Sequence, residues 1–139
     1  MTRFCLLLLI VLPAYVWANG TTTTNCSREE AMKAEDEVAN LKNAQAIYLS
    51  YKRFRHCDDG SIAEGYSESV ARLLADKWGE LEALNGLTSS DQQFERFILR
   101  HLDSTIAQQD RKIILSNARE HCPPQTKRLC SLMEKALAR

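Results

Sequence analysis

The sequence predicts an all-α domain, a compact bundle of five or six helices held together by two disulfides. Apolar residues recur at spacings of three and four along most of the chain, which is the pattern of one helical face. Only five glycines and three prolines interrupt the 139 residues, so long helices are favoured over many short strands. Four of the five cysteines follow an export signal, as is typical of small disulfide-bonded exported domains.

The beginning of the chain has the three-part plan of a secretory signal peptide. Arg3 precedes an apolar run over residues 4–12, which is too short to span a bilayer. We therefore expect a signal over residues 1–18, a polar linker over 19–26 and a single helical domain over 27–139. The protein is expected to be exported, with the periplasm favoured over the extracellular medium, and no stable membrane span is expected.

Four cysteines remain after the expected signal: Cys26, Cys57, Cys122 and Cys130. An even number of cysteines in a small exported chain predicts two disulfides. Their spacings contain no Cys-x-x-Cys pair, and an oxidising compartment favours a disulfide over a zinc site. We accordingly expect neither a metal ion nor a cofactor.

The pairing of these cysteines depends on whether the first helical stretch is continuous. One unbroken helix over residues 27–56 would place Cys26 and Cys57 about 45 Å apart, so each would have to bridge to a C-terminal cysteine. A break at residues 40–43, where Asn43 is a suitable helix cap, would allow Cys26 to pair with Cys57. Loop-closure entropy slightly favours the crossed arrangement, because it links the two ends of the chain.

Capping patterns place the first two helical stretches. Ser27 and Ser61 are each followed three residues later by a glutamate, which is the capping-box pattern of a helix start. The first stretch is expected to end near Cys57. The second carries the strongest apolar stripe, and we expect it to be the central core helix and to end near Leu84, because an Asn-Gly pair follows.

Three further helices are expected in the second half of the chain. One spans Ser90–Leu102, the next contains residues 106–118 and is stopped by a Pro-Pro pair, and the last contains residues 129–137. Gly65 and Gly79 fall inside the central stretch, where a glycine costs about 0.5–1 kcal/mol relative to alanine. Each is therefore expected at a close approach of another backbone.

The densest polar cluster spans the end of the first helical stretch and the start of the second. We expect it to form a contact patch for a protein partner, through Arg53, Arg55, Asp58, Asp59, Glu64 and Glu68. The chain has 18 basic and 18 acidic residues, so a nucleic-acid partner, which normally meets a basic excess, is not expected. The expected partner is another exported protein.

The sequence favours a binding protein over an enzyme, and no catalytic residue is predicted. Ser67 lacks the Gly-x-Ser-x-Gly turn that exposes a hydrolase nucleophile. The alternative hypothesis is a small-ligand carrier or an enzyme, in which Asp58, Glu64 and His101 converge in an aromatic-lined cleft. His101 lies on the apolar face of its helix, where we expect a histidine at the edge of the core.

The segment from Cys57 to Ser67, in the form Cys-Asp-Asp-Gly-x-x-Ala-Glu-Gly-Tyr-Ser, resembles a segment of small exported bacterial helical proteins. Cys122-Pro123 and Leu129-Cys130 fit the same pattern. This resemblance implies a compartment and a helical fold, and it implies no activity. In size, export signal, helical content and disulfides the chain is also similar to periplasmic immunity proteins, which bind and block a toxin. That similarity of architecture implies a function of the inhibitor or immunity type.

Overall fold

The computed structural model describes residues 25–138, so the expected signal and most of the linker lie outside the described residues. The α-helices in this part are α1 (Arg28–Val38), α2 (Ala44–Phe54), α3 (Gly60–Asp76), α4 (Leu81–Ser90), α5 (Gln92–Arg100), α6 (Gln108–Glu120) and α7 (Lys127–Leu137). Short 3₁₀ turns follow α2 and precede α4 and α7, over Arg55–Cys57, Trp78–Glu80 and Pro124–Thr126. The all-α prediction is confirmed. None of the helices within residues 25–138 is long and apolar enough to cross a membrane.

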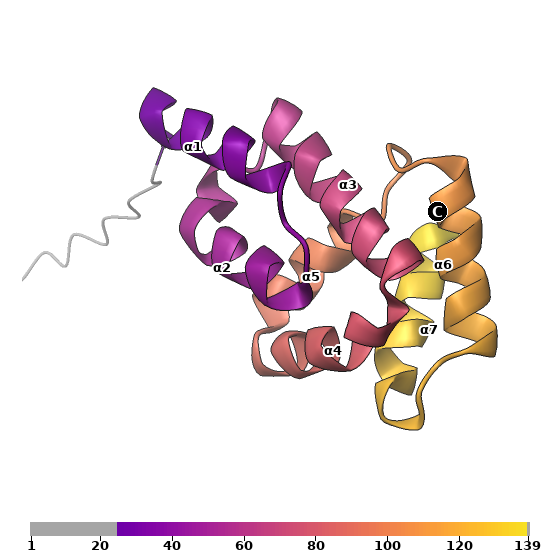
Figure 1. Cartoon of the computed structure of the whole chain (residues 1–139). Coiled ribbons are helices and arrows are strands. Elements are labelled where there is room, and N and C mark those ends of the chain that lie inside the picture. The colour runs from indigo at the N-terminus through magenta and orange to yellow at the C-terminus, as the bar shows by residue number, and fades with distance from the viewer. Residues whose placement is uncertain (1–24, 139) are drawn as a thin grey trace, which may run out of the picture.

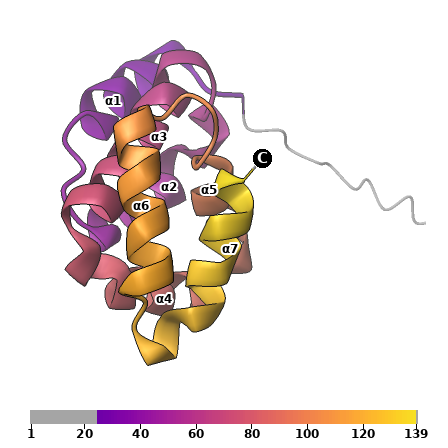
Figure 2. The ribbon, with the colours of Figure 1, turned by 90° about the vertical axis from the view of Figure 1, so that its right-hand side faces the viewer.

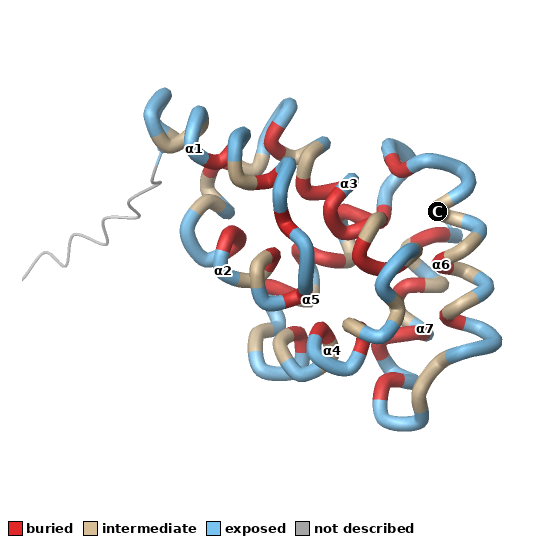
Figure 3. Tube along the Cα trace, viewed as in Figure 1, coloured by how far each residue is buried: buried red, intermediate tan, exposed pale blue. Residues whose placement is uncertain are grey.

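The helices form two groups that are joined by α3. Figure 1 shows α1 and α2 at one end of the molecule, α6 and α7 at the other, and α3 running between them. Both α1 and α6 pack along α3, and α6 and α7 lie side by side (Figure 2). Tyr66 of α3, Phe94 of α5 and Ile114 of α6 are completely buried in the shared interior. The buried segments of every helix contribute to this one core (Figure 3).

The break that the sequence left open as one of two alternatives within the first helical stretch is present. α1 ends at Val38, and α2 starts after Asn43, whose side chain accepts a hydrogen bond from the backbone N–H of Ala46 at 2.8 Å. Leu41 is buried in the connection and anchors it to the core. Because the chain reverses direction here, the two ends of the 27–56 stretch lie close together.

The disulfides consequently link neighbours in the chain, and the favoured crossed arrangement is wrong. Cys26 pairs with Cys57 across 31 residues, and Cys122 pairs with Cys130 across eight. The entropy of loop closure favours long loops, but the geometry of the folded chain decides which sulfur atoms can meet. Two disulfides are consistent with an oxidising compartment.

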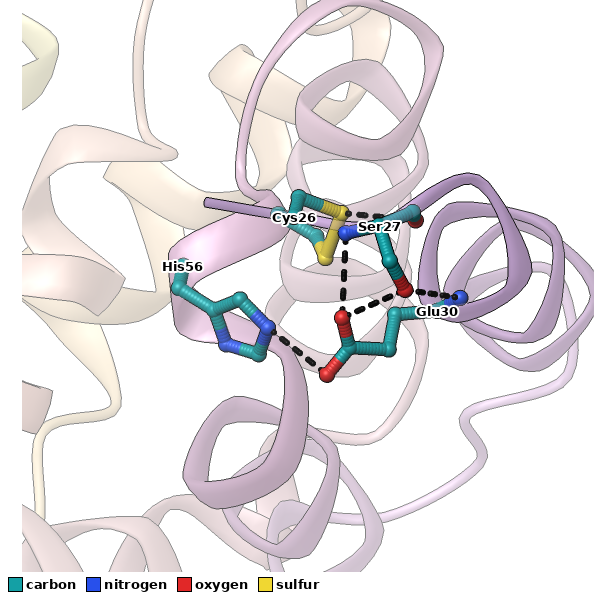
Figure 4. The surroundings of a disulfide bond; sticks show 5 residues. Cys26, Ser27, Glu30 and His56 are labelled. Carbon is teal, nitrogen blue, oxygen red and sulfur yellow. Dashed lines mark hydrogen bonds and ion pairs between the residues drawn. A yellow bond between two sulfur atoms is a disulfide. The ribbon is translucent and has the colours of Figure 1, made fainter. Parts of the chain in front are cut away.

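Side chains from the start of α1 and from the turn after α2 form hydrogen bonds beside the first disulfide (Figure 4). Ser27 Oγ accepts a hydrogen bond from the backbone N–H of Glu30 at 3.2 Å, and the Glu30 carboxylate accepts one from the backbone N–H of Ser27 at 3.0 Å. The expected capping box is therefore present. His56 Nε2 lies 3.2 Å from Glu30 Oε1. The hydrogen bond from the Ser27 side chain, and to a lesser extent the one from its backbone N–H, lower the pKa of Glu30 to about 2. This carboxylate is therefore ionised at neutral pH.

The expected central helix consists of two helices, which raises the number of α-helices in residues 25–138 to seven. Lys77 leaves the helical region with φ −132° and ψ 48°, and a 3₁₀ turn leads into α4. Trp78 Nε1 donates to the backbone oxygen of His121 at 3.0 Å, and Glu80 accepts from the backbone N–H of Ala44 at 3.1 Å. The apolar stripe continues across this bend because both helices pack against the same core, so periodicity did not reveal it.

Three helix ends differ from the expected ones. Asp59, not Ser61, caps α3, because Gly60 adopts φ +53° and turns the chain into the helix earlier. α4 continues through the Asn-Gly pair to Ser90. Asp91 then caps α5, since its carboxylate accepts from two backbone N–H groups at 3.0 Å.

The close approach expected at Gly65 is present, but it involves a side chain of α1 and not its backbone. A Cβ atom added at Gly65 would lie 2.4 Å from Cγ2 of Val38. Gly79 has no neighbouring atom within 4 Å of such a position, so the expectation for that residue is wrong. Gly65 therefore allows α1 and α3 to pack closely.

We expect Gly65→Ala to lower the free energy of unfolding by about 1–3 kcal/mol, because the added methyl group overlaps the stiff Val38 side chain. Gly86→Ala is the matched control, since Gly86 lies within α4 with open space around it. The control should gain about 0.5–1 kcal/mol from helix propensity. Urea unfolding measures both, and an equal gain in the two variants would contradict the close packing.

Candidate functional site

Three of the six predicted binding residues have partners within the described part of the chain. Arg53 donates to the Glu37 carboxylate of α1 at 2.6 Å, which ties α2 to α1. Glu68 accepts from Arg72 one helical turn later at 2.8 Å. Asp59 caps α3, as described above. For these three residues the contacts explain the residue type without a binding partner.

Asp58 points inward and is the centre of a buried polar row. Its side chain is only 3% exposed. Its Oδ2 atom lies 3.2 Å from His101 Nε2 and also accepts a hydrogen bond from the guanidinium of Arg100. Ser67 Oγ lies 3.0 Å from the other ring nitrogen of His101, Nδ1. The row Ser67, His101, Asp58 thus connects α3, the end of α5 and the turn after α2.

Two aromatic rings pack against the imidazole ring of His101. Its ring lies 4.4 Å from the ring of Phe97 and 5.7 Å from that of Tyr66, measured between centroids. The Tyr66 hydroxyl is 2.8 Å from Ser50 Oγ, and burial raises the pKa of Tyr66 to about 12, so it stays protonated. His101 is 2% exposed, in agreement with the expectation that it belongs to the core.

A small cavity of about 210 Å³ lies against this row. Its lining includes Asp58, Glu64 and His101, so the structure brings together the three residues of the alternative hypothesis. Acidic and basic side chains share this lining, and His101 is its one aromatic residue within residues 25–138. Tyr66 and Phe97 pack in the core behind it.

Burial alone would raise the pKa of Asp58, because a charged carboxylate loses its hydration. The hydrogen bond and charge of His101 and the neighbouring Arg100 outweigh this effect and lower the pKa below its ordinary value of 3.8. Asp58 is therefore ionised at neutral pH. Its second oxygen, Oδ1, is buried and has no hydrogen-bond partner among residues 25–138.

The order hydroxyl, imidazole and carboxylate is the one that enzymes use to activate a serine nucleophile. Ser67, however, is 3% exposed and lies in the middle of α3. Backbone N–H groups in a helix interior are already bonded within the helix, so they are not free to stabilise an oxyanion. The hydrogen bonds of this row fix the positions of the His101 ring and the Asp58 carboxylate, which is a structural role.

A second, larger hollow of about 840 Å³ lies beside the small cavity, and no sequence pattern predicted it. We call it the α5–α7 groove, because α5, α6, α7 and the connection between α5 and α6 line it. Its apolar floor consists of Leu99, Leu102, Leu132 and Ala136, and its basic residues are Arg96, Arg100, Arg111 and Lys135. Arg100 and Asp103 line both hollows, so the two are adjacent.

Three of the four basic residues that line this groove form no ion pair within residues 25–138. Arg96, Arg111 and Lys135 have no ion-pair partner within residues 25–138. The Arg111 guanidinium is held by backbone oxygens, those of Leu137 and of Asp103, and its buried Nε has no partner in the described part. The groove is thus lined by apolar side chains and by three basic ones that have no acidic partner in the described part of the chain.

Of the remaining predicted residues, Arg55 extends this basic surface. Its guanidinium donates to Gln93 at 2.8 Å and to the Tyr51 hydroxyl at 3.2 Å, and it pairs with no acid among the described residues. Arg55 lines a shallow depression together with Arg96 and Arg100, both of which also line the α5–α7 groove. The basic surface therefore runs from the end of α2 to α7.

We expect Asp58→Asn to lower the free energy of unfolding at neutral pH by about 2 kcal/mol, because a charged partner of two buried hydrogen bonds is lost. A carboxylate whose pKa is depressed in the folded state contributes stability above its unfolded pKa, and this contribution is lost as the pH falls through the folded value. The variant should therefore lose less stability below pH 3.8 than the parent does.

Urea unfolding from neutral pH to about pH 3 measures this difference. Asp59→Asn is the matched control, because Asp59 is an exposed neighbour outside the buried row. Its stability should fall with pH in parallel with the parent. A parallel curve for Asp58→Asn as well would contradict the stabilisation of the ionised Asp58 carboxylate by His101 and Arg100.

No protein-family model, curated protein or solved structure matches this chain. The resemblance to small exported bacterial proteins and the similarity to immunity proteins therefore remain predictions. Across the described residues, no group of three or more histidines, cysteines, aspartates or glutamates is placed to hold a metal ion. The two adjacent hollows that share Arg100 are the candidate functional site.

Proposed function

We propose that this chain is an exported, periplasmic protein-binding module whose partner is another exported protein. The observation that carries the proposal is the α5–α7 groove, where an apolar floor lies beside four basic side chains, three of which, Arg96, Arg111 and Lys135, have no ion-pair partner within residues 25–138. Arginine is enriched at protein interfaces, and apolar contact surrounded by charge is their usual arrangement. Two residues of the predicted contact patch are connected with this surface. Arg55 extends it beside Arg96, and Asp58 pairs with Arg100 of the groove lining.

The disulfides and helix packing suit such a function. Cys122–Cys130 joins the end of α6 to α7, which are two of the helices that form the groove. A groove that is rigid before binding loses less conformational entropy when the partner docks. An inhibitor or immunity protein, the type of binder that the architecture is similar to, gains affinity in this way.

The proposal is tested by site-specific photo-crosslinking. A benzophenone side chain at Ser104, an exposed residue in the groove lining, should crosslink a protein in the exported fraction of the organism that makes this chain. The same probe at Ser89, an exposed position on α4 outside the groove, should not. Mass spectrometry identifies the captured protein. If it is an enzyme, loss of its activity on adding the chain establishes an inhibitor.

Equal crosslinking from Ser104 and Ser89 would show that the groove is not the binding surface. No crosslinked protein from Ser104, with both probe variants unfolding like the parent, would contradict the binding module and favour the alternative below.

The second candidate function is a small-ligand carrier or enzyme at the small cavity. The observation that favours it is the hydrogen-bonded row of Ser67, His101 and Asp58 beside Glu64. A fluorophosphonate probe labels activated serines, and Ser67→Ala is the control that removes this one. We expect no difference between the parent and Ser67→Ala, because Ser67 is 3% exposed. Labelling that Ser67→Ala abolishes would overturn this expectation and establish a serine nucleophile.

A further inference from the structure

The α5–α7 groove also carries information about the chemistry of its partner, and the inference that follows rests on the proposed binding function. We propose that the groove binds an acidic, amphipathic segment of the partner protein. Apolar side chains of that segment lie on the floor, and its carboxylates pair with Arg96, Arg111 and Lys135.

The charges around the groove are the first argument. Four basic residues line it against one acid, Asp103, and the Asp103 carboxylate already accepts from the backbone N–H and the hydroxyl of Thr105 at 2.8 and 2.6 Å. Outside the groove some basic residues form ion pairs, as Arg53, Arg72, Arg119 and Arg128 do. Others, among them Lys42 and Arg55, form none within residues 25–138. The groove therefore brings together three basic side chains, those of Arg96, Arg111 and Lys135, that have no ion-pair partner within residues 25–138, and carboxylates complement them.

The position of Arg111 is the second argument. Backbone oxygens at the end of α7 and after α5 hold its guanidinium, while its Nε is buried without a partner in the described part. An arginine that is fixed by carbonyl oxygens keeps its full positive charge, because carbonyls are neutral. A carboxylate that docks here meets an arginine whose orientation is already set, which reduces the entropy lost on binding.

The apolar floor of the groove favours an acidic protein segment over other anionic ligands, because a protein segment also has apolar side chains. Leu99 and Leu132 are partly exposed in the floor, while Leu102 is buried beneath them. A nucleic-acid strand is usually held by aromatic stacking as well as by cations, and no aromatic residue is in the described lining. A membrane surface would instead require protruding apolar side chains. The exposed large apolar residues, Met32 and Leu49, lie on α1 and α2, at the other end of the molecule (Figure 1).

The experiment uses the full chain, expressed with export so that both disulfides form. Its probe is a fluorescent helical peptide of about 14 residues, or about 21 Å, with leucines along one face and glutamates on both flanks. The matched probe has glutamine at every glutamate. Fluorescence anisotropy should show binding of the acidic peptide and at least about tenfold weaker binding of the glutamine peptide. Binding of the acidic peptide should weaken as salt is raised.

Charge reversals locate the bound peptide. The double variant Arg96→Glu/Lys135→Glu should weaken binding by at least about tenfold. Lys42→Glu/Lys127→Glu makes the same change in net charge at exposed residues outside the groove lining, and it should bind like the parent. All four residues are exposed, so both variants are expected to fold, and circular dichroism checks this.

Equal affinity for the two peptides, no binding of either, or an equal loss in both double variants would overturn the proposed partner class. Binding to phosphatidylglycerol vesicles in place of the peptide, lost in Arg96→Glu/Lys135→Glu, would also overturn it and assign the groove to a membrane. The crosslinking experiment separates this failure from failure of the proposed function. A partner captured at Ser104 together with no peptide binding leaves the binding module standing and removes only its acidic partner class.

Discussion

The burial of the Asp58 carboxylate is the constraint on which the candidate site depends. A buried charge is costly unless it is paired, and both groups that pair with it, Arg100 and His101, come from the end of α5. The turn after α2 can therefore bury Asp58 only when α5 is docked against it. Ser67 extends the same row into α3 through His101, so three segments are positioned by one ionised side chain.

The first disulfide restrains the same turn covalently. Cys57 precedes Asp58 directly, and its bond to Cys26 holds the turn against the start of α1. The end of α5 is in turn fixed by Asp58, and Arg100 reaches both hollows from there. The α5–α7 groove and the small cavity are consequently not independent features, because Arg100, which pairs with Asp58, also forms part of the groove lining.

The features that the sequence predicted correctly depend on residues a few positions apart. The Ser27 capping box and the Asn43 cap are examples, since each involves a hydrogen bond across three residues. The division of the central stretch into α3 and α4 was missed because the bend at Lys77 is stabilised by distant partners: Trp78 there bonds to the backbone of His121. A period of three to four residues cannot report a contact across 43 residues.

The sequence by itself determined the helical class and the start of α1, and it supplied the four cysteines for two disulfides. These properties follow from local hydrogen bonds and from the periodic burial of apolar side chains. Only the tertiary structure decided which cysteines pair, that Asp58 lies inside and not in a surface patch, and that α5, α6 and α7 enclose a groove. The physical reason is that helix packing sets these distances, and packing depends on how side chains from remote segments fit together.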